Sequence, residues 1–348
     1  MPIWTPNTRE HEMAVHDQRS VCVNFDACDR LAAAIRNMDV PEDREELQPS
    51  GLSRAGLSDF YLPLVAICHQ TQSLRGTIDG KPTRGWDYLN AMFRRAVERD
   101  PSLLGSARWA ELSEAELRNL FVDPDAGETL SQPGDRAALL RNLGSVMLAE
   151  GWSCFNHLYS AAETRISSGE PNLLGLLARF RAYDDPVRKK STFLLGLVRN
   201  EAGVAFADEE NLLPPVDYHE IRGHLRIGTV VVLDRDLRRK LLDRIEVTTD
   251  EDVAIRSAVL EAIRYIASRV GLPDSMRLHY LFWNLFRSIC TRESPHCRSC
   301  PTVSSLPERY DRLLTDSSGS RICPFASVCR SVDAADRYVE HVFATDWY

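Results

Sequence analysis

RLHYLFWNLFRSICTRESPHCRSCP, residues 277–301, carries an apolar segment into three cysteines in the order C-x6-C-x2-C. These are Cys290, Cys297 and Cys300, and Cys323 and Cys329 follow further along the chain. Thiolates gathered this closely usually share a metal, because one ion or cluster needs several soft ligands that converge on it. We therefore expect a metal centre in this part of the chain.

Three kinds of site could use these cysteines. A disulfide framework is the least favoured, because no signal peptide is apparent and a chain of 348 residues does not need covalent staples to hold a core. A structural zinc site ranks second, since C-x2-C supplies half of the ligands in many zinc sites. Such sites usually combine two closely spaced ligand pairs, and the interval of six residues between Cys290 and Cys297 differs from that spacing. A [4Fe-4S] cluster held by four thiolates is the favoured interpretation.

Composition points to a soluble enzyme of one or two domains. Hydrophobic residues make up 44% of the chain, enough for one large core or two moderate lobes. No uninterrupted apolar run is long enough for a membrane span, and the polar start MPIWTPNTREHE lacks the apolar core of a signal peptide, so we expect a cytoplasmic protein. The net charge of -8 gives no long-range attraction to nucleic acid, which would have to bind a local basic face.

The hydrophobic pattern is helical along most of the chain. We expect residues 1–18 to be a tail and 41–56 a polar loop, and only GTVVVLD, residues 228–234, resembles a strand. One helix should be capped by Thr249 or Asp250 and end at Gly271. Further helices are expected over residues 25–37, 57–68, 86–98 and 135–150. The sequence therefore predicts an all-α fold.

Three short segments together resemble one enzyme family. Besides residues 277–301, these are LPLVAICHQTQSLRG, residues 62–76, and PPVDYHEIRGHLRIG, residues 214–228. In this order they resemble the endonuclease III and adenine-glycosylase branch of the helix-hairpin-helix DNA glycosylases, which carries a C-terminal iron-sulfur loop. The resemblance implies a two-lobed helical fold and cleavage of the N-glycosidic bond of a base swung out of DNA.

Asp217 is the first catalytic candidate. Two prolines and Val216 place it at the start of a helix, where its carboxylate would meet free backbone N–H groups. In the resembled family this aspartate is both cap and catalyst, because a carboxylate beneath C1′ stabilises an oxocarbenium-like transition state. Tyr218, His219 and Arg222 would lie at the substrate side of this segment, with His219 and Arg222 expected to pack and form salt bridges across the lobes.

Lys190 is the second catalytic candidate. It lies in FRAYDDPVRKKSTFLLGLV, residues 180–198, where the family has its hairpin, and a lysine of lowered pKa could attack C1′ and add a lyase step. Pro186, Val187 and Arg188 stand where the family has hairpin glycines, which puts the usual cradle for a DNA phosphate in doubt. A solvated lysine at a helix start is the alternative.

Gln70 and Gln72 form the third element of the resemblance. Gln70 holds the position of the family glutamine that fills the gap left by the flipped base, and a polar helix end would explain it equally well. Val65 stands where adenine glycosylases have a catalytic glutamate, which argues against adenine as the excised base.

The fourth cluster ligand departs from the resembled pattern. The family has a cysteine five residues after C-x2-C, and Leu306 occupies that place here. CPFASVC, residues 323–329, arrives only after a long insertion. We favour Cys329, because Cys323 and Pro324 through Cys329 repeat the family's C-P-x4-C ending, and keep Cys323 as the alternative.

Two other functions compete with DNA glycosylase. The chain also resembles, more loosely, the queuosine-salvage nucleoside glycosylases, which lack the cysteine loop and act on a free modified nucleoside. A hypermodified base in phage DNA would reconcile features of both. A protein that binds DNA through its cluster and senses redox state, without catalysis, is the third possibility.

The expected architecture has two helical lobes. Residues 57–210 would form a helical barrel lobe that carries Gln70 and Lys190, and residues 19–56 with 211–348 would form the other, with Asp217 and an iron-sulfur loop at about 290–329. Lys190 and Asp217 would face each other across a cleft, and we expect a monomer. The remaining four cysteines are expected to be small buried apolar residues, namely Cys22, Cys28, Cys68 and Cys154.

Overall fold

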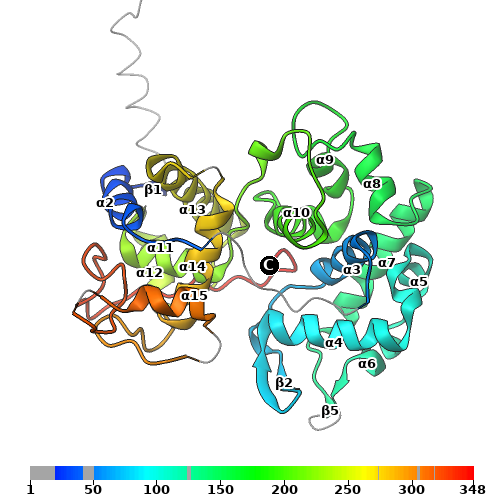
Figure 1. Cartoon of the computed structure of the whole chain (residues 1–348), viewed down its shortest axis with the longest axis horizontal. Helices are drawn as coiled ribbons and strands as arrows, with labels where there is room; N and C mark the ends of the chain where they lie inside the picture. Colours follow the sequence, from blue (N-terminus) through cyan, green and yellow to red (C-terminus); the bar gives the residue numbers. More distant parts are fainter. Residues whose placement is uncertain (1–19, 42–50, 124–126, 273, 304–305, 317) are drawn as a thin grey trace, which may run out of the picture. The chain divides into compact units, whose positions relative to one another are not determined.

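A computed structural model describes residues 20–41, 51–123, 127–272, 274–303, 306–316 and 318–348 (Figure 1). The described chain is mostly helical, with 54% helix and 7% strand, so the predicted all-α class is confirmed. The predicted tail at 1–18 and most of the predicted loop at 41–56 lie outside the described residues.

The longer helices follow the hydrophobic pattern closely. α2, α3, α4, α7 and α13 lie at the five predicted places, within three residues at each end. Their bounds are Phe25–Arg36, Arg54–Ala66, Gly85–Arg99, Pro133–Ala149 and Thr249–Val270. The others are α5 Ser106–Glu111, α6 Glu114–Leu120, α8 Phe155–Ala161, α9 Leu173–Leu177, α10 Lys189–Ala202, α11 Tyr218–Ile227, α12 Arg235–Asp243, α14 Met276–Ser288 and α15 Glu308–Asp311.

Strands form three small antiparallel pairs in the described residues. β6 (Val230–Val232) lies within the predicted strand and pairs with β1 (Val21–Val23), with Cys22 opposite Val231. β2 (Arg75–Ile78) pairs with β3 (Lys81–Arg84), and β4 (Val122–Asp123) with β5 (Gly127–Glu128). The partners of β6 and the two hairpins were not predicted, because strands this short carry too few residues for an alternating pattern.

The chain divides into two compact units. Among the described residues, unit 1 takes in 20–41, 216–272 and 277–344, and unit 2 takes in 51–215, 274–276 and 345–348. Four described segments that the sequence placed in the lobe of Asp217 belong to unit 2, namely residues 51–56, 211–215, 274–276 and 345–348. Asp217 and the cysteine-rich loop are therefore in unit 1, and Gln70 and Lys190 are in unit 2.

Unit 1 is built around α13. α2 packs along α13, and α11 contacts it as well (Figure 1). The N-cap of α13 is Thr248, one residue before the predicted Thr249, because the Thr248 hydroxyl and the Glu251 carboxylate form a reciprocal capping box. Gly271 ends the helix in the left-handed conformation, as predicted.

Unit 2 is built from two closely packed helix pairs, α3 with α10 and α5 with α7. A Cβ atom at Gly144 of α7 would lie 2.4 Å from the backbone nitrogen of Ala110, so only glycine permits α5 and α7 to approach this closely. The loop from 209 to 215, where the helical pattern breaks, is a turn of 3-10 helix at Glu209–Asn211 followed by irregular chain.

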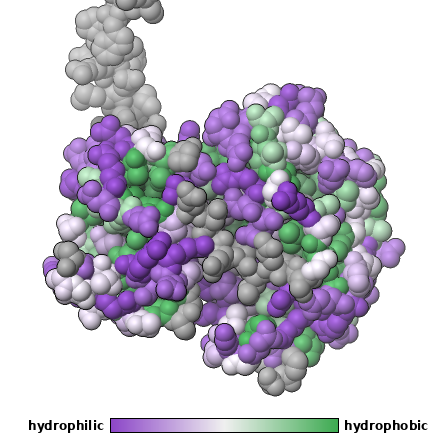
Figure 2. All heavy atoms as spheres, in the orientation of Figure 1, coloured by the Kyte–Doolittle hydropathy of each residue, from purple (hydrophilic) through white to green (hydrophobic). Residues whose placement is uncertain are grey.

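The face of the molecule seen in Figure 2 is largely polar. Figure 2 shows hydrophilic side chains over much of the visible face of each unit, with smaller apolar areas between them. No helix in the described ranges is long and apolar enough to cross a membrane. Cys28 and Cys68 are buried as predicted, whereas Cys22 in β1 and Cys154 at the N-cap of α8 are only partly buried because both lie outside the packed helix faces.

Candidate functional site

Asp217 is the N-cap of α11, as the sequence predicts. Its carboxylate accepts hydrogen bonds from the backbone N–H groups of His219 at 2.8 Å and Glu220 at 3.2 Å. Glu220 returns the contact, since its carboxylate accepts from the Asp217 N–H at 3.1 Å. This capping box fixes both carboxylates at the positive end of the α11 dipole.

The Glu220 carboxylate also reaches a second helix. Glu220 is fully buried, and its other oxygen lies 3.0 Å from Nδ1 of His279 in α14. Burial and the charge of Asp217 raise the pKa of the neighbouring Tyr218 phenol. Tyr218 therefore stays a neutral hydroxyl beside the Asp217 carboxylate. The sequence did not single out Glu220 or His279, although an acidic residue three positions after an aspartate is typical of a capping box.

His219 and Arg222 pack and form ionic contacts inside unit 1. Arg222 is 2% exposed, and its guanidinium lies 2.7 Å from a Glu340 carboxylate oxygen and 2.9 Å from Nδ1 of His219. It also donates to the carbonyl oxygens of Phe286 and Cys290. The predicted salt bridge across the lobes is thus wrong for Arg222, because Glu340 follows the cysteine loop in the same unit.

Arg226, one turn further along α11, holds the start of the cysteine loop. Its guanidinium donates to the carbonyl oxygens of Thr291, Arg292 and Tyr338 at 2.6–2.7 Å. The same group lies 3.3 Å from the sulfur of Cys290. This contact holds the Cys290 sulfur beside a buried arginine side chain.

The loop brings the two cysteine segments together through the backbone. The Cys323 N–H donates to the carbonyl of Cys297 at 3.1 Å, and the Cys300 N–H donates to the carbonyl of Arg321 at 2.9 Å. At the other end, the Cys329 thiol faces the carbonyl oxygen of Arg226 at 3.4 Å. Residues separated by a long insertion in the sequence are therefore neighbours in space.

The five thiols influence one another electrostatically. Burial, followed by the charges of Cys290, Cys300 and Cys297, raises the pKa of Cys323. Burial raises the pKa of Cys329 to about 11, and Cys290 and Cys297 add to the shift. Cys323 thus interacts with all three of the first cysteines and Cys329 with two.

The donor set suits a soft metal or an iron-sulfur cluster, because several thiols of one loop lie near each other and a buried arginine faces one of them. As the side chains stand in the described residues, no three His, Cys, Asp or Glu groups converge as ligands of a single ion.

Lys190 lies at the start of α10 and is fully buried, so it is not the solvated lysine that the sequence left as an alternative. Its ammonium donates to the carbonyl oxygen of Ala66, the last residue of α3, at 2.6 Å. Burial lowers the pKa of Lys190 to about 7. The lowered pKa suits an amine nucleophile, whereas the buried position suits a cap on the C-terminal end of α3.

The segment before α10 differs from a phosphate-binding hairpin. The Asp185 carboxylate accepts from the N–H groups of Val187 at 3.0 Å and Lys189 at 2.8 Å. Arg188 adopts the left-handed conformation with φ 62°. The N–H groups that would receive a phosphate are therefore bound to a carboxylate of the chain itself, which agrees with the missing glycines.

Gln70 follows the end of α3 and is held in a left-handed conformation with φ 43°. Its side chain contacts Gln132, which also has a positive φ of 52° and precedes α7; the two amides lie 3.3 Å apart. Gln72 is exposed two residues later. Non-glycine residues at positive φ are uncommon and gather at functional sites. No pattern in the sequence pointed to Gln132, since its contact with Gln70 arises only on folding.

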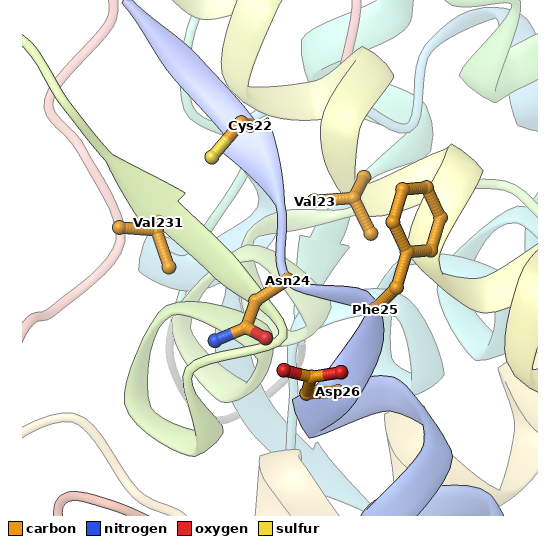
Figure 3. Close-up of a pocket in the computed structure, with 6 residues that line it drawn as sticks. All are labelled: Cys22, Val23, Asn24, Phe25, Asp26 and Val231. Atoms are coloured by element: carbon orange, nitrogen blue, oxygen red, sulfur yellow. The ribbon is translucent and has the colours of Figure 1, made fainter.

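A separate shallow hollow lies at the N-terminus of α2 in unit 1 (Figure 3). It is lined by Cys22, Val23, Asn24, Phe25, Asp26 and Val231. The Asn24 side chain caps α2 by accepting from the Ala27 N–H at 3.1 Å. None of the predicted site residues lines this hollow.

Comparisons with known proteins leave the site to be judged by its own residues. No family model matches the chain, and no curated protein matches it by sequence. Each unit therefore has its own candidate region: Asp217 with its capping box and the cysteine loop in unit 1, and the surroundings of Gln70 and Lys190 in unit 2.

Proposed function

We propose that the protein is a DNA N-glycosylase that flips out a damaged or modified base and hydrolyses its N-glycosidic bond. The observation that carries the proposal is the immobilised carboxylate of Asp217, bound by two backbone N–H groups and backed by Glu220. Such a carboxylate can stabilise an oxocarbenium-like sugar or activate water without moving. The helix-hairpin-helix glycosylase fold, implied by the sequence resemblance, is part of this proposal.

Lys190 serves, in this proposal, to hold the end of α3, with the lyase step as the alternative. Its ammonium is buried against Ala66, so it would have to leave that carbonyl to attack C1′. We expect no adduct when the protein is treated with borohydride on an oligonucleotide that carries an abasic site. An adduct that disappears in Lys190→Ala would instead establish the lysine nucleophile.

A [4Fe-4S] cluster is the proposed cofactor, with Cys290, Cys297 and Cys300 as three ligands. Cys329 is the proposed fourth ligand, and Cys323 is the alternative. When bound, the cluster would cross-link the loop that Arg226 holds to α11. Iron content and visible absorbance of Cys323→Ala and Cys329→Ala separate the two, and zinc without iron in anaerobically purified protein would contradict the cluster.

The most informative test of the function is a panel of substrates. Base release would be measured on duplex and single-stranded oligonucleotides with modified bases, on modified and unmodified phage DNA, and on free modified nucleosides. We expect abasic sites in at least one DNA substrate. Release only from free nucleosides would favour the nucleoside glycosylase, and binding without release from any substrate would favour a redox-sensing DNA-binding protein. We propose a cytoplasmic location, where free thiols persist.

A further inference from the structure

Residues Thr345–Tyr348 lie against Gln70 in unit 2, although the preceding residues 277–344 belong to unit 1. The Gln70 backbone N–H donates to the main-chain oxygen of Tyr348 at 3.0 Å. The Gln70 side-chain amide donates to the carbonyl of Thr345 at 2.9 Å. Both donors of Gln70 are therefore bound to this short segment.

The two residues between these contacts are held by their side chains. The Asp346 carboxylate lies 2.9 Å from the Arg181 guanidinium, and the Trp347 indole N–H donates to Asp184 at 3.1 Å. Arg181 is 54% and Asp346 24% exposed, so water can compete with this ion pair. The segment is thus attached by a few polar contacts at the surface.

His69, which precedes Gln70 in the chain, is a buried polar residue surrounded by positively charged side chains. His69 is 1% exposed, and neither of its ring nitrogens has a hydrogen-bond partner among the described residues. Burial and the positive charges of Lys190, Arg136, Lys189 and Arg181 lower the pKa of His69 to about 2. Of these four cations, Arg181 is exposed and pairs with Asp346, so an anion that displaces the segment would bind at Arg181.

We propose that Thr345–Tyr348 is an internal occupant of the DNA-binding site of unit 2, and that a DNA strand displaces it. The inference rests on the proposed function, in which Gln70 enters the duplex. The segment presents a carboxylate to Arg181 and two aromatic rings beside it, the same two kinds of group that a nucleotide offers as phosphate and base. Gln70 can fill the space of a flipped base only after it releases Thr345 and Tyr348.

An internal competitor lowers the apparent affinity by the fraction of molecules in which the site is open. Replacing Thr345–Tyr348 by Gly-Ser-Gly-Ser should therefore tighten binding of a labelled duplex with an abasic-site analogue by about tenfold. Asp346→Asn should tighten it less. Asp79→Asn, which removes the same charge from an exposed ion pair with Arg95 elsewhere in unit 2, is the matched control and should have little effect.

Addition of the peptide Thr-Asp-Trp-Tyr in trans should weaken DNA binding by the Gly-Ser variant, and hydrogen exchange at the Gln70 amide should be faster in that variant than in wild type. Equal DNA affinity of wild type and the Gly-Ser variant would overturn the inference. The proposed function is tested separately by base release. If the protein releases a base but binds DNA equally with and without the segment, the glycosylase function stands and the proposed role of Thr345–Tyr348 is wrong.

Discussion

Arg226 contributes more to the structure than the sequence around it suggests. It is 2% exposed, and its guanidinium satisfies carbonyl oxygens of Thr291, Arg292 and Tyr338. A carbonyl left unpaired away from water costs about 1–3 kcal/mol, so this one arginine stabilises both the start of the cysteine loop and the chain at Tyr338. The sequence analysis did not single out this arginine, because the carbonyl oxygens that it binds lie 65, 66 and 112 residues further along the chain.

Replacing Arg226 by methionine should lower the free energy of unfolding by about 1–3 kcal/mol, because three part-buried carbonyl oxygens lose their donor. Urea unfolding would measure the change. Arg239→Met in α12 is the control, since Arg239 is 67% exposed and should change stability by less than about 0.5 kcal/mol. A variant as stable as wild type would mean that the loop is not held by Arg226.

α11 is the element that joins the candidate catalytic residue to the cysteine loop. Asp217 begins it, Arg222 and Arg226 bind the loop from its side, and Gly228 ends it at φ 90°. The N-cap and the terminal glycine were predictable, because caps depend on residues close in sequence. The carbonyl oxygens that Arg222 and Arg226 bind could not be predicted, because these contacts join segments distant in the sequence.

Gly223 permits α11 and α14 to pack closely. A Cβ atom at this position would lie 2.2 Å from the ring of Phe286. Gly223→Ala should therefore destabilise the protein by about 1–3 kcal/mol, although alanine is the better helix former. Thermal or urea unfolding would show it.

Gly56→Ala in α3 is the matched control. Its Cβ would meet only ordinary contacts of 3.4 Å or more, so the substitution should be neutral or stabilise by up to about 1 kcal/mol. The packing of α11 on α14 would be in doubt if both substitutions had the same effect.

Element prediction succeeded where a pattern extended over several turns. α13 and α2 each carry an unbroken apolar stripe, and their bounds follow from it. The short strand pairs β2 with β3 and β4 with β5 were not predicted, because four residues or fewer do not establish an alternation of apolar and polar residues. In the site, Asp217 was predictable as a cap, whereas Glu340, His279 and Gln132 became visible only as contacts between distant segments.

The stability of the whole molecule should depend on pH through two buried histidines. Burial lowers the pKa of His69 to about 2 and of His224 to about 3. Histidine has a pKa of about 6.5 in the unfolded chain, so below that pH the unfolded chain binds a proton at each of these residues while the folded protein does not. The free energy of unfolding therefore falls as the pH drops. Each histidine contributes about 1.4 kcal/mol per pH unit below that value.

Urea unfolding at about pH 7 and about pH 5.5 would measure this slope. His224→Gln should reduce the loss of stability on acidification, while His157→Gln, at an exposed position in α8, should leave it unchanged. An equal slope in wild type and His224→Gln would show that His224 does not stay neutral in the folded protein.

The central claim concerns the charge of Asp217. Asparagine caps a helix about as well as aspartate, so Asp217→Asn keeps the cap of α11 and removes the carboxylate. Asp234→Asn is the matched control, because Asp234 caps α12 in the same unit by accepting from the Leu237 N–H at 2.7 Å.

Single-turnover base release on the substrate found in the panel is the most direct measurement. We expect Asp217→Asn to lose about 10²–10³-fold in rate while its affinity for DNA stays unchanged, and Asp234→Asn to keep the wild-type rate. Base release by Asp217→Asn at the wild-type rate would contradict the account.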